Sequence, residues 1–277
     1  MIRQYIMKNK KGMFGIFVLF LFGLIAVLAP YIATRNPWES FKPNLGISKK
    51  HLLGTDLLGR DVFSQLIWGS RTSLLVGAGS AVGILIFGSL VGLVSALSNP
   101  FVDEILMRFT DIILYIPKLP LLIFLAMMLG RGFLNVVLVM IFTMWPQTAR
   151  IIRSEALSLK QRPFVEAVKV LGVGTFGLVK ILIPHILPLL LAALTNLTIW
   201  AVVYEASLSF LGLGDPSVIT WGTMLYYAHV SGIIFTGNYI PIIAPGLCIT
   251  IFGVGMHCLA SAIQDVYTQR TRLWKPF

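Results

Sequence analysis

The charged side chains inside long apolar runs are the first candidates for function, because a charge at membrane depth is costly. Lys118 lies near the middle of one such run, between Pro117 and Pro120. A charge there costs about 2.5–3.5 kcal/mol on insertion scales, so it usually faces protein or water. Prolines break local backbone hydrogen bonds, which is tolerated best beside a cavity. We therefore interpret Lys118 as a candidate for a transport pathway; the alternative is a lysine that reaches the membrane surface or pairs with Asp111 or Glu205.

Glu205 is a second candidate and lies at the outer end of the apolar run 181–204. A carboxylate in that place is suited to gating a path or to holding a substrate amine. The alternative is a structural role inside a helical bundle, and this is the interpretation that we favour.

No set of residues for catalysis or for a metal site is found in the sequence. The G-x-x-x-x-G-K-S/T loop that cradles phosphates is absent, so we expect no ATP hydrolysis by this chain itself. His185 has no second ligand at metal spacing and is more typical of a hydrogen-bonded residue at a helix end. Cys248 and Cys258 share one apolar run, where their spacing turns them about 80° apart on a helix and excludes a disulfide.

The composition indicates a polytopic membrane protein. Hydrophobic residues make up 57% of the chain and charged residues only 12%, whereas soluble domains are about one-quarter charged. The mean hydropathy is +0.86. The net charge of +11 comes from residues in loops and tails. We interpret it as a topology signal and a contact with anionic membrane lipid. Nucleic-acid binding would need a basic soluble face with stacking aromatics.

The apolar runs predict six transmembrane helices and thus an all-α fold. Each run is close to the ~20 residues that span a bilayer. The runs lie at residues 13–34, 74–97, 106–129, 132–149, 181–204 and 239–263. We divide the chain into two parts. Residues 1–73 form a tail, the first span and an external amphipathic segment. Residues 74–277 form the core membrane domain, with a basic loop at 150–188.

An even number of spans places both termini and the basic loop 150–188 on one side of the membrane. Basic loops favour the cytoplasmic side, so we expect a multi-pass protein of the inner or plasma membrane with both termini in the cytoplasm. Residues 51–77 predict a helix that lies in the membrane interface before the second span. Its apolar face is Phe63, Leu66, Ile67 and Ser70, and the residues off that face are Arg60, Asp61 and Gln65.

A short helix is predicted inside the basic loop. Pro163 suits a first helical position, and Gly172 and Gly174 suit a helix end. Between them one apolar face is formed by Phe164, Ala167, Val168 and Leu171. So short a helix is marginal alone in water. Periodicity leaves two interpretations open: a helix docked in the groove of a partner, and a helix on the membrane surface.

Three stretches resemble one family of transporters. Glu166-Ala167-Val168, then Gly172, then His185-Ile186-Leu187-Pro188 resembles the EAA loop of ABC importer permeases. The loop departs from the family pattern at Val168, at His185 and in the twelve residues, in place of nine, that follow Gly172. The motif around Gly54, Asp56 and Arg60, and the sequence YEASLSFLGLG at 204–214, resemble the peptide-and-nickel branch of that family.

The resemblance implies the six-helix fold of type I ABC importer permeases with a cytoplasmic coupling helix. The coupling residues would be Phe164, Glu166, Ala167, Leu171 and Gly172. It also implies a second, homologous permease, an external solute-binding protein, and two ATPase subunits that carry ATP and Mg. Peptides are the expected substrate, with nickel and oligosaccharides as alternatives within the same machinery.

Two functions from other classes are less consistent with the sequence than an ABC importer permease. A self-contained secondary transporter would show inverted repeats and paired broken helices, and no convincing repeat relates the two halves of this sequence. A membrane scaffold without transport activity would not need the many Pro and Gly residues that lie inside the apolar runs. Co-purification of the chain with an ATPase would separate these functions.

Overall fold

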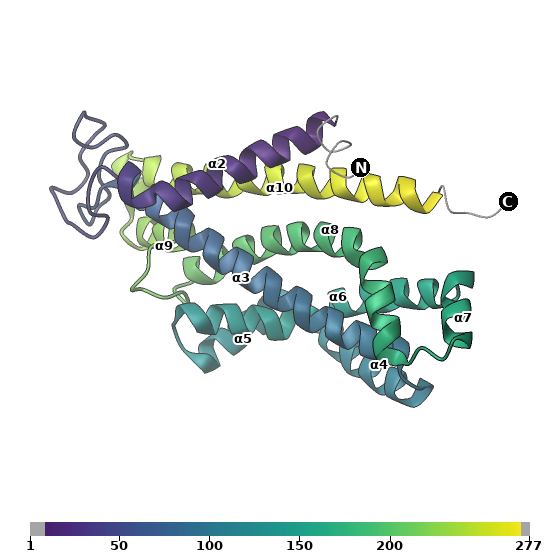
Figure 1. Cartoon of the computed structure of the whole chain (residues 1–277). Helices are drawn as coiled ribbons and strands as arrows, with labels where there is room; N and C mark the ends of the chain where they lie inside the picture. Colours follow the sequence, from purple (N-terminus) through teal and green to yellow (C-terminus); the bar gives the residue numbers. More distant parts are fainter. Residues whose placement is uncertain (1–8, 273–277) are drawn as a thin grey trace.

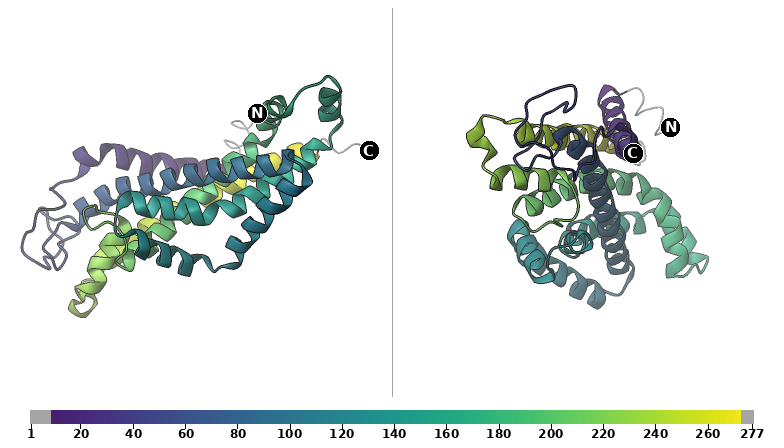
Figure 2. Two further views of the ribbon diagram at one scale, coloured as in Figure 1. Left: turned by 90° about the horizontal axis from the view of Figure 1, so that it is seen from below. Right: turned by 90° about the vertical axis from the view of Figure 1, so that its left-hand side faces the viewer.

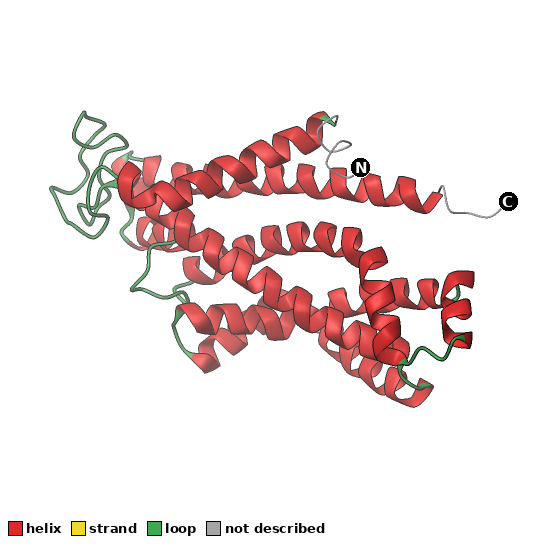
Figure 3. Ribbon diagram, in the orientation of Figure 1, coloured by secondary structure: helices red, strands yellow, loops and turns green. Residues whose placement is uncertain are grey.

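The structure, a computed structural model, describes residues 9–272, apart from the side chains of residues 169, 176 and 266–272 (Figure 3). This part of the chain is a bundle of helices, and its extended pairs are limited to isolated bridges between residues 40 and 61. The all-α prediction is confirmed. The elements are α2 (Lys10–Ile32), α3 (Val62–Leu97), α4 (Pro100–Tyr115), α5 (Lys118–Leu129), α6 (Phe133–Lys160), α7 (Pro163–Val170), α8 (Thr175–Phe210), α9 (Trp221–Val230), η1 (Ile233–Thr236) and α10 (Ile240–Arg272).

Among the described residues, 5 helices are long and apolar enough to cross a membrane, namely α2, α3, α6, α8 and α10. Together α4 and α5 pass the same test, but they are bent by 92° and count as a broken span. The prediction of one helix over 106–129 is therefore wrong, while the broken pair gives a sixth span. Pro117 is the cause, because proline lacks an N–H and keeps the preceding residue extended. Ile116 indeed has φ −79° and ψ 129°.

The predicted interfacial helix before the second span is also wrong. α3 continues from Val62 to Leu97 without a break, and its first turn is capped by the Asp61 carboxylate, which accepts the Ser64 N–H at 2.8 Å. Gln65, expected on the polar side, is 3% exposed. It is tolerated there because its Nε2 donates to Asp56 Oδ2 at 3.0 Å. The predicted boundary at residue 73 lies inside α3.

Residues 33–61 form a compact lobe beside α9 at one end of the bundle (Figure 1). Gly54 and Gly59 have φ of +75° and +80°, a conformation that other residues rarely adopt, and at Gly59 a Cβ would collide with the carbonyl of Phe41. The lobe is held by polar contacts. His51 Nδ1 lies 2.9 Å from the buried carboxylate of Asp61.

The other end of the bundle carries α7. The first turns of α2, the last described turns of α10 and the loop that contains α7 all lie at this end (Figure 1). α7 projects beyond the long helices, which a second view shows clearly (Figure 2, left). This arrangement is the one expected of an even number of crossings.

Glycines at the packed face of α3 bring it close to α6. Gly88 and Gly92 face the backbone of α6 at Trp145 and Ala149, and Gly83 faces Ile141. Close approach through small residues is the usual means of helix association in membranes. The space around Gly79, by contrast, is open.

Gly88 and Gly79, one packed and one in open space, give a matched pair of variants. We expect Gly88→Val to lower the thermal stability of the purified protein, because a Cβ at Gly88 would lie 2.7 Å from Thr148 Cβ and 2.8 Å from the Trp145 carbonyl oxygen. Overpacking typically costs about 1–3 kcal/mol. Gly79→Val adds the same atoms where nothing lies within 4 Å. Equal melting temperatures for the two variants would contradict the packing argument.

Candidate coupling helix and transport pathway

α7 is fixed to the bundle by one of its faces. It begins at Pro163, as predicted. Val165 is 1% exposed and belongs to a buried cluster with Leu182 and Ile186 of α8. The ring of Phe164 stacks on the imidazole of His185, with centroids 5.0 Å apart. Phe164 and Val165 thus hold α7 against α8.

The opposite face of α7 is exposed and is made of Glu166, Ala167, Val170 and Leu171. Val170 is 87% exposed and Leu171 is 80% exposed. The predicted apolar face of Phe164, Ala167, Val168 and Leu171 is therefore wrong. Phe164 and Val168 pack inside the protein against the buried cluster, which also contains Val165, a residue that the prediction left out. In the sequence, the feature that could have identified this exposed face is the pair of neighbouring apolar residues Val170 and Leu171 at the end of α7. These two side chains form a small exposed apolar surface at the projecting end of the bundle.

Gly172 ends the helix in the left-handed conformation, with φ +77°. The N–H of Leu171 donates to the Ala167 carbonyl at 3.2 Å and that of Val173 donates to the Val168 carbonyl at 3.4 Å, so the turn closes the last carbonyls of α7. α8 then starts at Thr175. His185 Nδ1 lies 3.0 Å from the Ile181 carbonyl oxygen, which confirms the predicted hydrogen bond. The expected place at a helix end is wrong, because α8 begins ten residues earlier, at Thr175.

A charged link joins α4 and α6 near the α7 end. Arg153 donates to both oxygens of Asp103, at 2.6 Å from Nε and 2.5 Å from Nη2. The Ser95 hydroxyl of α3 donates to the same carboxylate. Lys160 donates from Nζ to the Ala96 carbonyl at 3.1 Å. Because a bidentate arginine–carboxylate pair is strong and has a defined geometry, it fixes the orientation of α6 relative to α4. The helix that leads into α7 is thus tied to α3 and α4.

Lys118 lies at the start of α5, just after the break in the third span. Its Nζ donates to Gln147 Oε1 on α6 at 2.9 Å. The two acidic partners considered from the sequence are engaged elsewhere. Asp111 faces Arg150, with 3.3 Å between Oδ1 and Nη2. Lys118 is only partly buried, in keeping with a position beside a polar space.

Glu205 is buried, with 2% of its surface exposed. Its Oε1 accepts the Ser209 hydroxyl one turn further along α8, at 2.7 Å. Nearby, the Ser73 hydroxyl of α3 accepts the Trp221 N–H at 3.0 Å, which attaches the first turn of α9. In this conformation the carboxylate is covered by the bundle and supports its helix contacts.

We expect Glu205→Gln to keep the thermal stability of the protein close to that of the parent, because an amide oxygen still accepts the Ser209 hydroxyl. Glu205→Leu removes this acceptor and is expected to lower the free energy of unfolding by about 1–3 kcal/mol. Thermal unfolding in detergent measures both effects. A loss of transport in Glu205→Gln without a loss of stability would instead assign the carboxylate to the pathway.

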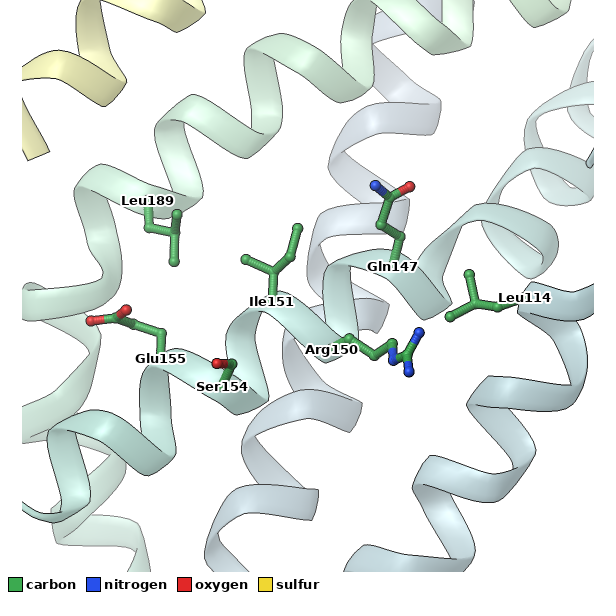
Figure 4. A pocket seen from close by; sticks show the side chains of 7 residues that line it. All are labelled: Leu114, Gln147, Arg150, Ile151, Ser154, Glu155 and Leu189. Atoms are coloured by element: carbon green, nitrogen blue, oxygen red, sulfur yellow. The ribbon is translucent and has the colours of Figure 1, made fainter. Parts of the chain in front are cut away.

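A cavity of about 710 Å³ opens between α4, α6 and α8 (Figure 4). Its polar lining comes from α6: Gln147, Arg150, Ser154 and Glu155. Leu114 of α4 and Leu189 of α8 lie at its edges, and the cavity is largely open to the surface. Glu155 and Ser154 were not identified as site residues from the sequence, although a polar stripe at helical spacing inside an apolar helix is a usable signal. Within residues 9–265, no group of three His, Cys, Asp or Glu side chains is placed to hold a metal ion.

Comparison with known proteins places these features in one family. Residues 84–273 match the family described as "Binding-protein-dependent transport system inner membrane component". Residues 1–48 match a second family, the "N-terminal TM domain of oligopeptide transport permease C". The first match contains α4, α6, α7 and α8, and with them the cavity and the exposed helix.

Individual relatives are similar over nearly the whole chain. The oligopeptide transport system permease protein OppC of Bacillus subtilis is 35% identical, with 95% of this chain and 87% of the relative covered. The di/tripeptide transport system permease protein DppC of Pseudomonas aeruginosa is 32% identical, covering 93% and 87%. The dipeptide transport system permease protein DppC of B. subtilis is 30% identical, covering 96% and 83%. The chain therefore belongs to the family of inner membrane components of binding-protein-dependent transport systems, as a multi-pass membrane permease.

Proposed function

We propose that this chain forms half of the translocation pathway of an ATP-driven ABC importer for peptides. A homologous second permease completes the pathway, an external solute-binding protein delivers the peptide, and two separate ATPase subunits bind ATP and Mg. The observation that carries the proposal is the exposed face of α7, where Val170 and Leu171 are 87% and 80% exposed at the projecting end of the bundle.

The exposed face of α7 is suited to a groove on an ATPase. A helix of eight residues has too little surface to bind alone, but α7 is already ordered by Val165 and Phe164, so docking costs little conformational entropy. Glu166 and Gly172 stand at either side of the apolar pair. We therefore assign coupling to Glu166, Ala167, Leu171 and Gly172 by contact with the ATPase, and to Phe164 by contact with His185.

In this proposal the α7 end faces the cytoplasm, and so do both termini. The basic residues of the loop 150–188 support this orientation. The lobe of residues 33–61 and α9 then face the outside, where the binding protein would dock. The protein would act in the inner or plasma membrane, with its loops in contact with lipid headgroups.

The mechanism follows from how α7 is connected. When ATP closes the ATPase pair, α7 would move as a rigid body with it. The Phe164–His185 stack would carry the movement to α8, and the Asp103–Arg153 pair would carry it from α6 to α4. These helices line the 710 Å³ cavity, so their tilt changes the side to which it opens. Lys118 and Gln147 lie along this path; Glu205 lies at its far end, inside the packed helices.

Peptides are the substrate class that the relatives' names support, since those proteins are described as permeases for oligopeptides, dipeptides and tripeptides. A tagged copy of the chain, expressed with its neighbouring transport genes and purified in mild detergent, tests the proposal. We expect it to carry an ATPase and a second permease, and to take up peptide into vesicles only with ATP and the binding protein. Uptake driven by an ion gradient without ATP would overturn it.

A further inference from the structure

We infer that the cavity between α4, α6 and α8 holds a zwitterionic peptide on its way through the membrane. Arg150, with Gln147 beside it, would take the carboxylate end, and Glu155 would take the amine end. This inference rests on the proposed function and adds a binding site, with the chemistry that it recognises, to the permease chain itself.

The first support is the placement of opposite charges in one cavity. Arg150 and Glu155 both line it, and Figure 4 shows Arg150 extending toward Leu114 of α4 and Glu155 extending to the opposite side, toward α8. Arg150 and Glu155 are five residues apart on α6, which turns their side chains toward opposite sides of the cavity. The cavity thus offers a cation on one side and an anion on the other, one for each end of a peptide.

The second support is that Arg150 is not fully used by the protein. Its neighbour Arg153 is locked to Asp103 by two short hydrogen bonds. Arg150 has a single contact of 3.3 Å to Asp111, whose Oδ1 makes no hydrogen bond in the described part of the chain, and its side chain is 57% exposed. A guanidinium has five N–H donors in a fixed fork that matches a carboxylate. Arg150 therefore retains donors for a ligand.

The third support concerns Lys118 and Gln147. Lys118 Nζ donates to Gln147 Oε1 at 2.9 Å, and Gln147 also lines the cavity. Lys118 thus places a cation next to Gln147, in addition to Arg150, whose charge is shared with Asp111. A lining that carries both a cation and an anion suits a zwitterion, whereas a neutral sugar has no use for paired charges. The lining therefore favours peptides among the substrates considered from the sequence.

The experiment compares uptake of three labelled forms of one dipeptide: free, amidated at its C-terminus and acetylated at its N-terminus. The whole transporter, with its binding protein, is used in vesicles of phosphatidylcholine. The parent and two variants, Arg150→Gln and Glu155→Gln, all receive peptide from the same binding protein. Changes in the ratios of uptake therefore belong to the permease.

We expect Arg150→Gln to lower uptake of the free peptide about tenfold relative to the amide, because it removes the charge-assisted hydrogen bonds that only the free carboxylate can make. Glu155→Gln should do the same relative to the acetylated form. Arg108→Gln is the matched control: it removes a charge from α4 at a side chain that is 76% exposed and pairs with Glu104 outside the cavity. Its ratios should equal those of the parent.

Three outcomes would overturn the inference. Equal losses for all three peptides would show that Arg150 and Glu155 act only on structure. Unchanged ratios would show that the cavity does not hold the peptide ends. A dependence on Arg150 that appears only with vesicles of anionic lipid would assign the site to a headgroup phosphate. Failure of the parent transporter to take up any peptide with ATP would instead contradict the proposed function.

Discussion

Replacement of Gly172 by valine is expected to lower ATP-driven uptake about tenfold while the variant still inserts and folds. Gly172 has φ +77°, and the left-handed conformation costs other residues about 1–2 kcal/mol. A difference of 1.4 kcal/mol is about tenfold in the population of the correct turn. The turn sets the direction of α7 relative to α8, so its loss should separate ATP hydrolysis from transport.

The effect at Gly172 is conformational, because nothing lies within 4 Å of a Cβ at this position. Gly174 supplies the control. It lies two residues further on, also in open space, but its φ of −70° and ψ of 174° suit any residue. Gly174→Val should keep the parent's uptake. The two variants are compared for ATPase activity and for uptake in the same vesicles, and equal uptake by both would count against a mechanical role of this turn.

The apolar runs were sufficient to predict that the spans are helical and roughly where they lie, because hydropathy is a local property of a sequence. They did not predict the ends of the helices, since α3, α6 and α8 extend well beyond the runs 74–97, 132–149 and 181–204. The start of α7 was predicted for a similar reason, since Pro163 carries a local signal. Pro117 indicates a local break in the third apolar run. Hydropathy could not predict that the chain bends by 92° between α4 and α5, because an average over a window carries no information on direction.

Which face of a helix is covered depends on partners far along the chain. Periodicity placed Phe164 and Leu171 on one face of α7, but His185 covers Phe164 and leaves Leu171 exposed. Gln65 was expected to be exposed because it is polar, and the Asp56 carboxylate makes its burial possible. The cavity was not predicted because residues 150–188 were expected to form a loop, whereas α6 continues as a helix to Lys160 and carries both Arg150 and Glu155.

Replacement of Leu171 by aspartate is expected to prevent the ATPase from binding to the permease. Leu171 is 80% exposed, so the change should leave the free energy of unfolding almost unaltered. In the docked state the new carboxylate would be buried against apolar groups without a partner. Uncompensated buried charges cost about 3–5 kcal/mol, which corresponds to more than a hundredfold loss of affinity at the middle of that range.

The measurement is the amount of ATPase that co-purifies with tagged permease, together with the melting temperature of each variant. Ile47→Asp is the matched control, since Ile47 is an apolar residue that is 68% exposed in the lobe at the opposite end of the bundle. It should retain the full amount of ATPase. If Leu171→Asp retains it as well, α7 cannot be the docking element. If the exposed face of α7 binds the ATPase, its other face must hold the helix firmly against α8, because only then can a movement of the ATPase reach the membrane helices. The contacts of Val165 and Phe164 with α8 meet this requirement.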